Sequence, residues 1–172
     1  MMTSGDSAAD RDHVSTRAMS EADWDDVRRI YGDGLATGIA TFETEVASRE
    51  DLDHKWHPDQ RWVAVVEDRL AGWTAAMPVS TRRCYAGVAE TSVYVDTGFR
   101  GRGVGRALLR RQTAEADAAG IWTLQTAIFA VNEPSIALHT SSGYRVVGTR
   151  ERIAQRDGVW HDTVLLERRR RD

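Results

Sequence analysis

Three glycines at positions 101, 103 and 105 constrain most strongly how this chain can fold. The stretch "AETSVYVD" before them is rich in β-branched and aromatic residues and predicts a strand. Behind them, "GVGRALLRRQTAEADAAG" predicts a helix that Gly120 ends, and "IWTLQTAIF" predicts a buried strand. Strand, glycine loop, helix and strand in this order predict a βαβ unit, whose two strands are parallel neighbours in one sheet.

Further elements are expected on either side of this unit. Ser20, followed by Glu21 and Asp23, predicts the start of a helix that runs through "WDDVRRIYGDGL". The stretch "RWVAVVEDRLAGWTAAMPV" predicts two strands around a tight turn at residues 67–69. A short helix at "EPSIALHTSSG" and two strands around the turn pair Asp157-Gly158 follow. The pattern predicts a fold of the α/β class.

The chain has 172 residues, of which 41% are hydrophobic and 28% charged, enough for one sizeable core and too few for a second. Residues 1–13 are polar and acidic, and we expect a disordered tail there. Residues 14–168 then form one domain. Residues 169–172 end the run "ERRRRD", which we expect to be a solvated basic tail.

Composition also restricts partners and location. The net charge of -3 provides no basic field for nucleic acid. The one cysteine, Cys84, has no partner in the chain for a disulfide, which favours a reducing compartment. No segment is apolar for long enough to be a signal peptide or to cross a membrane, so we expect a cytoplasmic protein without a membrane partner. The five histidines have no zinc-ligand spacing, and we expect no metal.

The glycine loop does not match two common phosphate-binding motifs. A P-loop needs Lys and then Ser or Thr after its second glycine, and neither is present. A dinucleotide-binding loop needs a third glycine where Arg106 stands, and an acidic residue after the next strand, where Ala130 stands. The N–H groups of residues 102–106 at a helix start still suit a pyrophosphate, with arginine side chains adding donors. The alternative is a tight strand-to-helix turn with solvated arginines.

The pattern Arg100-x-x-Gly103-x-Gly105 after an apolar strand resembles the acetyl-CoA pyrophosphate loop of the GNAT superfamily of N-acetyltransferases. A second GNAT-like element follows in "VNEPSIALHTSSGY". The segments "IYGDGLATGIATFETE", "AETSVYVD" and "GVWHD" resemble phosphinothricin acetyltransferases and the related methionine sulfoximine or methionine sulfone acetyltransferases. The resemblance implies a single-domain GNAT fold, in which a mixed central sheet is flanked by helices and two parallel strands splay apart at the acetyl-CoA site. It also implies a homodimer.

The resemblance further implies which residues bind acetyl-CoA as a cosubstrate. Residues 93–95 should pair with the pantetheine amides like an added strand, and the N–H of Val95, freed where the strand bulges, is the candidate oxyanion donor. Asn132 is expected to bond pantetheine or phosphate. The full expected set is Val93, Tyr94, Val95, Arg100, Gly101, Arg102, Gly103, Val104, Gly105, Arg106, Asn132, Ser135 and Tyr144.

Two residues are candidates for proton transfer. Glu90 matches the glutamate proposed as base in the phosphinothricin enzymes, acting directly or through a water; the alternative is a strand-end carboxylate in water. His139 stands where many GNAT enzymes have a tyrosine that protonates the leaving thiolate, and phosphinothricin enzymes have histidine. A neutral imidazole can serve as acid or base, although a lone histidine among apolar residues is often a core group. Tyr144 is expected to pack beside the cofactor.

The acceptor pocket is expected to be lined by "TGIATFETE", with Phe42 and Glu43 as candidates beside Glu90. Arg82 and Tyr85 match a basic and an aromatic position that relatives carry near the acceptor. Phe42 could instead be core, and Arg82 a surface arginine without a partner. Trp160, His161 and Asp162 match a motif at the pocket rim or the dimer contact, although Trp160 could simply cover the sheet.

The sequence also departs from the family pattern. Residues 79–80 are Val-Ser where relatives usually have an aromatic and then a basic residue, and Val46 replaces a common proline. We therefore expect an N-acetyltransferase for the α-amine of a small amino-acid analogue, with an acceptor that can differ from those of its relatives. Two alternatives stay open: a protein N-terminal or polyamine acetyltransferase, and a non-catalytic acyl-CoA-binding module.

Overall fold

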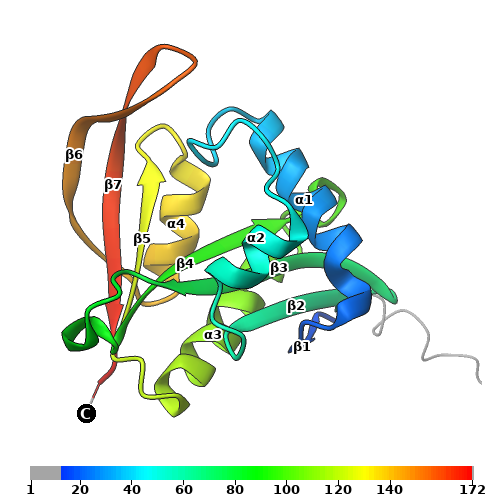
Figure 1. Cartoon of the computed structure of the whole chain (residues 1–172). Helices are drawn as coiled ribbons and strands as arrows, with labels where there is room; N and C mark the ends of the chain where they lie inside the picture. The colour runs from blue at the N-terminus through cyan, green and yellow to red at the C-terminus, as the bar shows by residue number, and fades with distance from the viewer. Residues whose placement is uncertain (1–12, 172) are drawn as a thin grey trace, which may run out of the picture.

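The computed structural model describes residues 13–171, and in it a mixed seven-stranded sheet lies between two layers of helices (Figure 1). The strand order is β1-β2-β3-β4-β5-β7-β6. The strands are β1 (Ser15–Ala18), β2 (Arg61–Val66), β3 (Arg69–Pro78), β4 (Val88–Val95), β5 (Thr123–Phe129), β6 (Arg145–Arg156) and β7 (Val159–Arg169). The helices are α1 (Trp24–Ala36), α2 (Arg49–Lys55), α3 (Val104–Ala118) and α4 (Glu133–Ser141), with short 3-10 turns η1 (Glu21–Asp23), η2 (Arg83–Tyr85) and η3 (Thr97–Phe99).

The predicted βαβ unit is confirmed. Strands β4 and β5 are parallel neighbours, and α3 connects them. Gly120 follows the end of α3 with φ +78°, and the N–H of Ile121 donates to the C=O of Ala116 at 2.9 Å. A glycine in the left-handed region and this backward bond end a helix because they satisfy its last carbonyls. The glycine loop is therefore held between a strand and a helix, as the sequence predicted.

The other predicted turns and helix starts also form. At the start of η1, the N–H and hydroxyl of Ser20 both donate to the Asp23 carboxylate, at 2.7 and 2.9 Å, and α1 continues from there. Glu67 and Asp68 have φ of 50° and 58° in the turn between β2 and β3. Such a turn has the twist that an antiparallel hairpin needs.

Three features differ from expectation. The four-residue β1 and the seven-residue α2 were not predicted, because both are short and largely exposed and so have no clear hydrophobic period. The basic run at the end of the chain is not fully solvated, since β7 continues to Arg169. Arg168 within it pairs with Asp117 of α3, at 2.6 Å for one of its two bonds. The expected tail at residues 1–12 lies outside the described residues.

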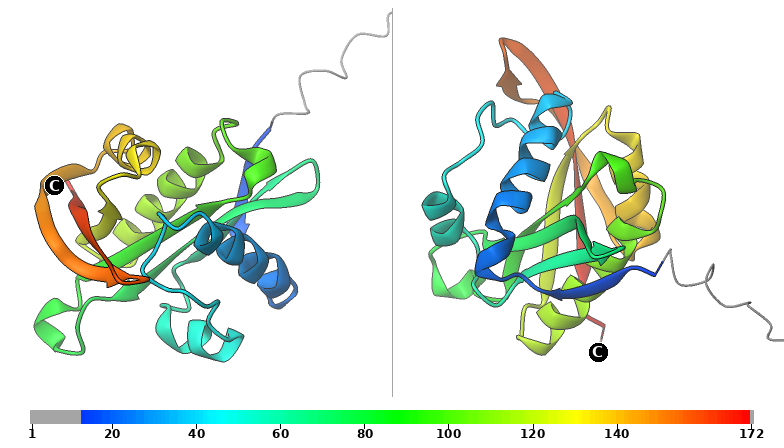
Figure 2. Two further views of the ribbon diagram at one scale, coloured as in Figure 1. Left: turned by 90° about the horizontal axis from the view of Figure 1, so that it is seen from above. Right: turned by 90° about the vertical axis from the view of Figure 1, so that its right-hand side faces the viewer.

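Helices α1 and α2 cover one face of the sheet, and α3 and α4 cover the other (Figure 2). The first face buries aromatic residues, among them Trp24, Trp56 and Trp73. The second face buries mainly aliphatic residues of α3 against β2 and β3, among them Val104 and Leu108. Hairpin β6–β7 extends beyond the body of the sheet (Figure 1). No helix between residues 13 and 171 is long and apolar enough to cross a membrane.

Candidate active site

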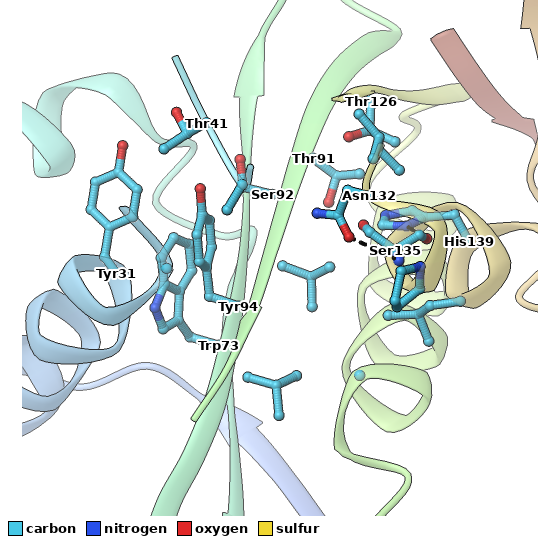
Figure 3. A pocket seen from close by; sticks show the side chains of 18 of the residues that line it. Tyr31, Thr41, Trp73, Thr91, Ser92, Tyr94, Thr126, Asn132, Ser135 and His139 are labelled. Carbon is cyan, nitrogen blue, oxygen red and sulfur yellow. Dashed lines mark hydrogen bonds between the residues drawn. The ribbon is translucent and has the colours of Figure 1, made fainter. Parts of the chain in front are cut away.

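A cavity of about 990 Å³ opens where β4 and β5 separate. The parallel pairing of these strands covers only Val88 to Glu90, opposite Thr123 to Gln125. Beyond that point the cavity lies between them, lined by Val93 and Val95 on one side and by Ile128 and Phe129 on the other. The cavity is lined from both faces of the sheet, which the splayed strands make possible (Figure 3).

The splay leaves backbone groups of β4 available to a ligand. The C=O of Gly87 accepts from β5, and the N–H of Asp96 donates to β3. Because backbone groups alternate sides along a strand, the odd-numbered residues Val93 and Val95 direct theirs toward the β5 side, where no strand pairs with them. The pairing of β3 with β4 continues to Val95 without a register shift. The expected bulge is therefore wrong, and the separation of the strands exposes these groups instead.

The glycine loop borders one end of the cavity. Gly101 and Gly103 have φ of 76° and 82°, a region that disfavours any side chain. The first N–H groups of α3 have no acceptor within the helix, and Arg100 and Arg106 line the cavity beside them. A Cβ at Gly105 would come within 2.7 Å of a Leu138 methyl group on α4. The loop thus has the free donors, positive charge and close packing that a pyrophosphate site requires.

Arg102 differs from the other two arginines of the loop. Its guanidinium pairs with Glu67 at 2.7 Å and lies 5.3 Å from the ring centre of Phe99. It is not among the residues that line the cavity. Its expected contact with the cofactor stays a prediction, and its side chain connects the loop to the turn between β2 and β3.

Asn132 holds two segments of the site together. Its side-chain oxygen accepts from the N–H of Ser135 at 3.3 Å and caps α4. Its side-chain nitrogen donates to the C=O of Ile39 at 3.3 Å. The oxygen and one N–H of the amide are therefore bonded within the chain. Asn132 and Ser135 both line the cavity, but the direct bond from the Asn132 side chain to the cofactor stays a prediction.

His139 lines the cavity with a side chain that is almost wholly buried. Its Nδ1 lies 2.8 Å from the C=O of Ser135, so we assign the proton of the neutral ring to Nδ1. Nε2 is buried without a hydrogen-bond partner among residues 13–171, and burial lowers the pKa of the imidazole. Tyr144 packs edge-on against it with ring centres 5.1 Å apart, and burial raises the pKa of that phenol. A neutral ring in this tautomer has an acceptor at Nε2 and no proton there to donate.

Glu90 lies where β4 and β5 separate, and its side chain is half-buried. Its cross-strand neighbour is Met77, and Tyr94, four residues further on, is opposite Trp73. Because side chains alternate faces along a strand, Glu90 and Tyr94 share the face covered by α1 and α2. The carboxylate therefore lies on the aromatic side of the cavity. It belongs to β4, the strand that borders the opening between β4 and β5.

Aromatic rings form the wall on that side. Tyr94 is stacked on Trp73 at 4.8 Å, Trp56 meets Trp73 at 4.9 Å, and Tyr31 meets Tyr94 edge-on at 5.1 Å. The hydroxyl groups of Tyr31 and Tyr94 point toward the side where Thr41 lies (Figure 3). Burial raises the pKa of both phenols, so both remain hydrogen-bond donors. Neither Tyr31 nor Trp56 was predicted to line a site. Tyr31 fitted the apolar period of its helix, and Trp56 belonged to no recognisable motif.

The loop between α1 and α2 borders the cavity, with Phe42 and Glu43 in it as predicted. Phe42 is half-buried and packs against Phe129 with ring centres 4.4 Å apart, and its contact with the acceptor stays a prediction. Arg156 of β6 donates to three carbonyl groups of this region, at Leu35 (2.9 Å), Thr41 (2.6 Å) and Glu43 (3.1 Å). This arginine was not predicted, because its position in the sequence carries no sign of the loop it holds.

The structure does not bring Arg82 and Tyr85 to the cavity. Both are exposed in the connection between β3 and β4, and the guanidinium lies 5.5 Å from the Tyr85 ring centre. Of the "GVWHD" residues, Trp160 is 53% exposed and does not cover the sheet, whereas His161 stacks on Phe129 at 4.8 Å. Asp162 accepts from the N–H of Arg152 at 2.8 Å and stabilises the hairpin. A cation that sequence reasoning missed, Lys55, lines the cavity.

Comparison with known proteins agrees with this geometry. The model of the acetyltransferase (GNAT) family matches residues 24–144. The chain belongs to the acetyltransferase (GNAT) family. GNAT relatives include a phosphinothricin N-acetyltransferase of Streptomyces viridochromogenes, 29% identical over 92% of this chain and 89% of its own length. An L-methionine sulfoximine/L-methionine sulfone acetyltransferase of Pseudomonas paraeruginosa is 34% identical over 48% of each chain.

A solved GNAT structure is also similar over nearly the whole chain. It is a phosphinothricin acetyltransferase of Sinorhizobium meliloti in complex with acetyl-CoA, 26% identical, with a TM-score of 0.83. The match covers 91% of this chain and 88% of that one. The GNAT fold that the resemblance implied, including its splayed parallel strands, is confirmed.

Proposed function

We propose that this chain is an acetyl-CoA-dependent N-acetyltransferase for the α-amine of a small amino-acid analogue, of the phosphinothricin, methionine sulfoximine or methionine sulfone type. The observation that carries the proposal is one continuous cavity that joins the glycine loop to the aromatic wall and that Glu90 also lines. The activities of the relatives, a phosphinothricin N-acetyltransferase and a methionine sulfoximine/methionine sulfone acetyltransferase, support the same reaction.

The residues at the glycine-loop end fit the cofactor. The N–H groups of residues 102–106 and the side chains of Arg100 and Arg106 would hold the pyrophosphate. The backbone groups of Val93 and Val95 would pair with the pantetheine amides as an added strand does. When bound, the thioester supplies an activated acetyl group.

The chain's own residues would then prepare the amine and the carbonyl. Glu90 removes a proton from the acceptor ammonium, directly or through a water, so that the nitrogen lone pair can attack. The N–H of Val95 stabilises negative charge on the carbonyl oxygen as it develops. His139, with an unprotonated Nε2, is better suited to accept a proton than to donate one. The amine nitrogen would attack the thioester carbonyl directly, with both substrates in the cavity. The C–N bond would form as the C–S bond breaks, and CoA would leave as a thiolate that takes up the proton released by the nitrogen.

The Glu90→Gln variant tests this assignment. Removing the base should lower kcat/KM by roughly 10²- to 10⁴-fold while the Kd of acetyl-CoA stays the same. Thiol release is measured with methionine sulfone, methionine sulfoximine and phosphinothricin as acceptors, and acetyl-CoA binding by calorimetry. Unchanged turnover in the variant would remove Glu90 from the mechanism.

The same acceptor panel separates the alternatives. Turnover of polyamines or peptide N-termini in place of amino-acid analogues would favour a protein N-terminal or polyamine acetyltransferase. Tight acetyl-CoA binding without turnover of any amine would favour a non-catalytic acyl-CoA-binding module.

We also propose that the active form is a homodimer. Strand β6 is the last strand of the sheet, and both of its faces are exposed along most of its length. Hairpin β6–β7 carries a concentration of exposed apolar residues, namely Val146, Val147, Ile153, Val159 and Trp160. An unpaired edge strand with exposed apolar side chains favours association with a second copy.

A further inference from the structure

Lys55 is the only lysine of the chain, and all 22 other basic residues, Arg11 to Arg171, are arginine. This lysine lines the cavity. It is the last residue of α2, beside Leu52 and Trp56, which line the cavity with it. Lysine differs from arginine in having a compact, strongly hydrated charge with three donors that can be directed freely.

The end of α2 is fixed against the strand that neighbours Glu90. The N–H of His57 donates to the C=O of Ala76 at 2.8 Å, and Trp56 packs on Trp73 at 4.9 Å. Ala76 precedes Met77, which is the cross-strand neighbour of Glu90. Lys55, an exposed residue on the cavity wall, therefore lies in the helix layer over the same part of the sheet as Glu90.

The charges around the cavity fall into two groups. Arg100 and Arg106 belong to the glycine loop, whereas the aromatic side has the carboxylates of Glu43 and Glu90 and the ammonium of Lys55. Within the part of the chain that the structure describes, the Lys55 side chain makes no hydrogen bond or ion pair. The two carboxylates attract an amine, but a ligand that has only an amine gives the Lys55 ammonium no acceptor. A ligand that also has an oxyanion would supply the missing partner.

We propose that Lys55 binds an oxyanion of the acceptor, a carboxylate or a phosphinate, while Glu90 receives the amine of the same molecule. The inference rests on the proposed function and narrows it. It limits good acceptors to amino acids and analogues with a free acid group, and it disfavours polyamines and amides. The apolar surfaces of Leu52, Trp56 and Met77 are left for the acceptor side chain.

The test compares Lys55→Met with wild type on three acceptors. Methionine sulfone has only an α-carboxylate, its carboxamide has no acid group, and phosphinothricin has both a carboxylate and a phosphinate. Loss of a charged hydrogen bond should raise KM for an acceptor that uses Lys55 by roughly ten- to a hundredfold, with kcat changed little. The KM of the carboxamide should be high in wild type and unchanged in the variant.

The acceptors also identify which oxyanion is bound. A higher KM of Lys55→Met for both methionine sulfone and phosphinothricin assigns the α-carboxylate as the bound oxyanion. An effect on phosphinothricin alone assigns the phosphinate. Equal KM values of variant and wild type for all three acceptors would overturn the inference.

Two control variants and a binding measurement complete the design. Lys55→Arg keeps the charge and should retain most of the affinity, whereas Arg83→Met removes an exposed cation outside the cavity and should change nothing. Acetyl-CoA affinity and the unfolding midpoint report whether each variant is folded. Calorimetric binding of methionine sulfone, measured without turnover, separates the two proposals. If the wild type acetylates no acceptor, the proposed function is contradicted. Weaker binding of methionine sulfone by Lys55→Met would still support the role of Lys55.

Discussion

The position of Gly34 illustrates how closely single residues pack around the acceptor side. A Cβ at this position would lie 2.5 Å from the ring of Tyr94, and that ring is stacked on Trp73. Real Cβ atoms do not approach other atoms so closely, so a side chain here must displace the tyrosine. Gly34 is thus a determinant of the cavity wall, although it makes no polar contact.

We predict that Gly34→Ala lowers the free energy of unfolding by roughly 1–3 kcal/mol and raises KM for the acceptor, because the tyrosine ring has to move. Urea unfolding and steady-state kinetics measure the two effects. Gly32→Ala is the matched control on the same helix, where a Cβ would meet only a Val46 methyl group at 3.3 Å. It should leave KM unchanged and keep or raise stability, since alanine favours a helix over glycine. Equal behaviour of the two variants would contradict the packing argument.

At the scale of elements, the contact between β6 and the loop after α1 has the strongest consequence for the site. Arg156 makes this contact by donating hydrogen bonds to the carbonyl groups of Leu35, Thr41 and Glu43. Its side chain is only 11% exposed. The C=O of Leu35 also accepts from the N–H of Gly38 at 3.1 Å, so the arginine matters most for the carbonyls of Thr41 and Glu43. The acceptor loop therefore takes its shape from a strand more than 110 residues away in the sequence.

We predict that Arg156→Met raises KM for the acceptor several-fold and leaves the Kd of acetyl-CoA unchanged, because the loop loses its support while the glycine loop is not affected. Kinetics and calorimetry measure the two constants separately. Arg156→Lys should recover part of the effect, and Arg150→Met, an exposed arginine on the same strand, should have none. A parallel loss of acetyl-CoA affinity in Arg156→Met would show that the bonds support the fold in general.

The elements differ in how well the sequence predicted them. The predicted strands β4 and β5 and helix α3 have clear hydrophobic periods and glycine stops, and all three are confirmed. Strand β1 and helix α2 were missed, because a short exposed element buries too few residues to produce a period. The consequence is functional, since α2 carries Lys55.

At the scale of the whole molecule, ion pairs join elements that are distant in the sequence. Arg17 of β1 pairs with Asp23 at 2.7 Å, and its hydrogen bonds hold the pKa of that carboxyl at about 2. Arg168 of β7 pairs with Asp117 of α3 and lowers the pKa of Asp117. A carboxyl with a lowered pKa in the folded state adds stability above its unfolded pKa of about 3.9, and this stability is lost as the pH falls through the folded pKa.

We predict that the free energy of unfolding is constant near neutral pH and falls with acidification below about pH 4. Asp117→Asn should be less stable than wild type at pH 7, with a difference that shrinks toward pH 2. Urea unfolding at a series of pH values measures this. Asp59→Asn is the control, because Asp59 is exposed and its carboxylate makes no ion pair or hydrogen bond with the other described residues. A constant difference at every pH would attribute the effect of Asp117→Asn to something other than its charge.

We predict that the protein sediments with twice the chain mass of 19.2 kDa. Val159→Asp, at an exposed position of hairpin β6–β7, should produce a folded monomer, because it places charge on the apolar surface of the hairpin. Analytical ultracentrifugation and circular dichroism measure mass and folding. Val131→Asp, exposed and outside the hairpin, should remain a dimer. A wild-type protein that sediments as a monomer would contradict the proposed dimer.

The sequence by itself determined the parts of the protein whose chemistry is local. Three glycines between a strand and a helix favoured a pyrophosphate site over a plain strand-to-helix turn, because the N–H groups and the helix start lie within a few residues, and the resemblance to the GNAT loop indicated acetyl-CoA as the ligand. Glu90, in the strand before them, was predicted as the base from the resemblance to the phosphinothricin enzymes. The structure places Glu90, Gly101, Gly103 and Gly105 on one cavity.

Only the tertiary structure decided the acceptor side. Tyr31, Lys55, Trp73 and Arg156 come from four separate elements, and each is locally an ordinary helix, strand or surface residue. Conversely, Arg82 and Tyr85 matched a family pattern but lie in an exposed connection away from the cavity. The physical reason is that packing of helices on a sheet brings side chains together without regard to sequence distance. The separation of β4 and β5, which depends on the whole sheet, determines where the two substrates can meet.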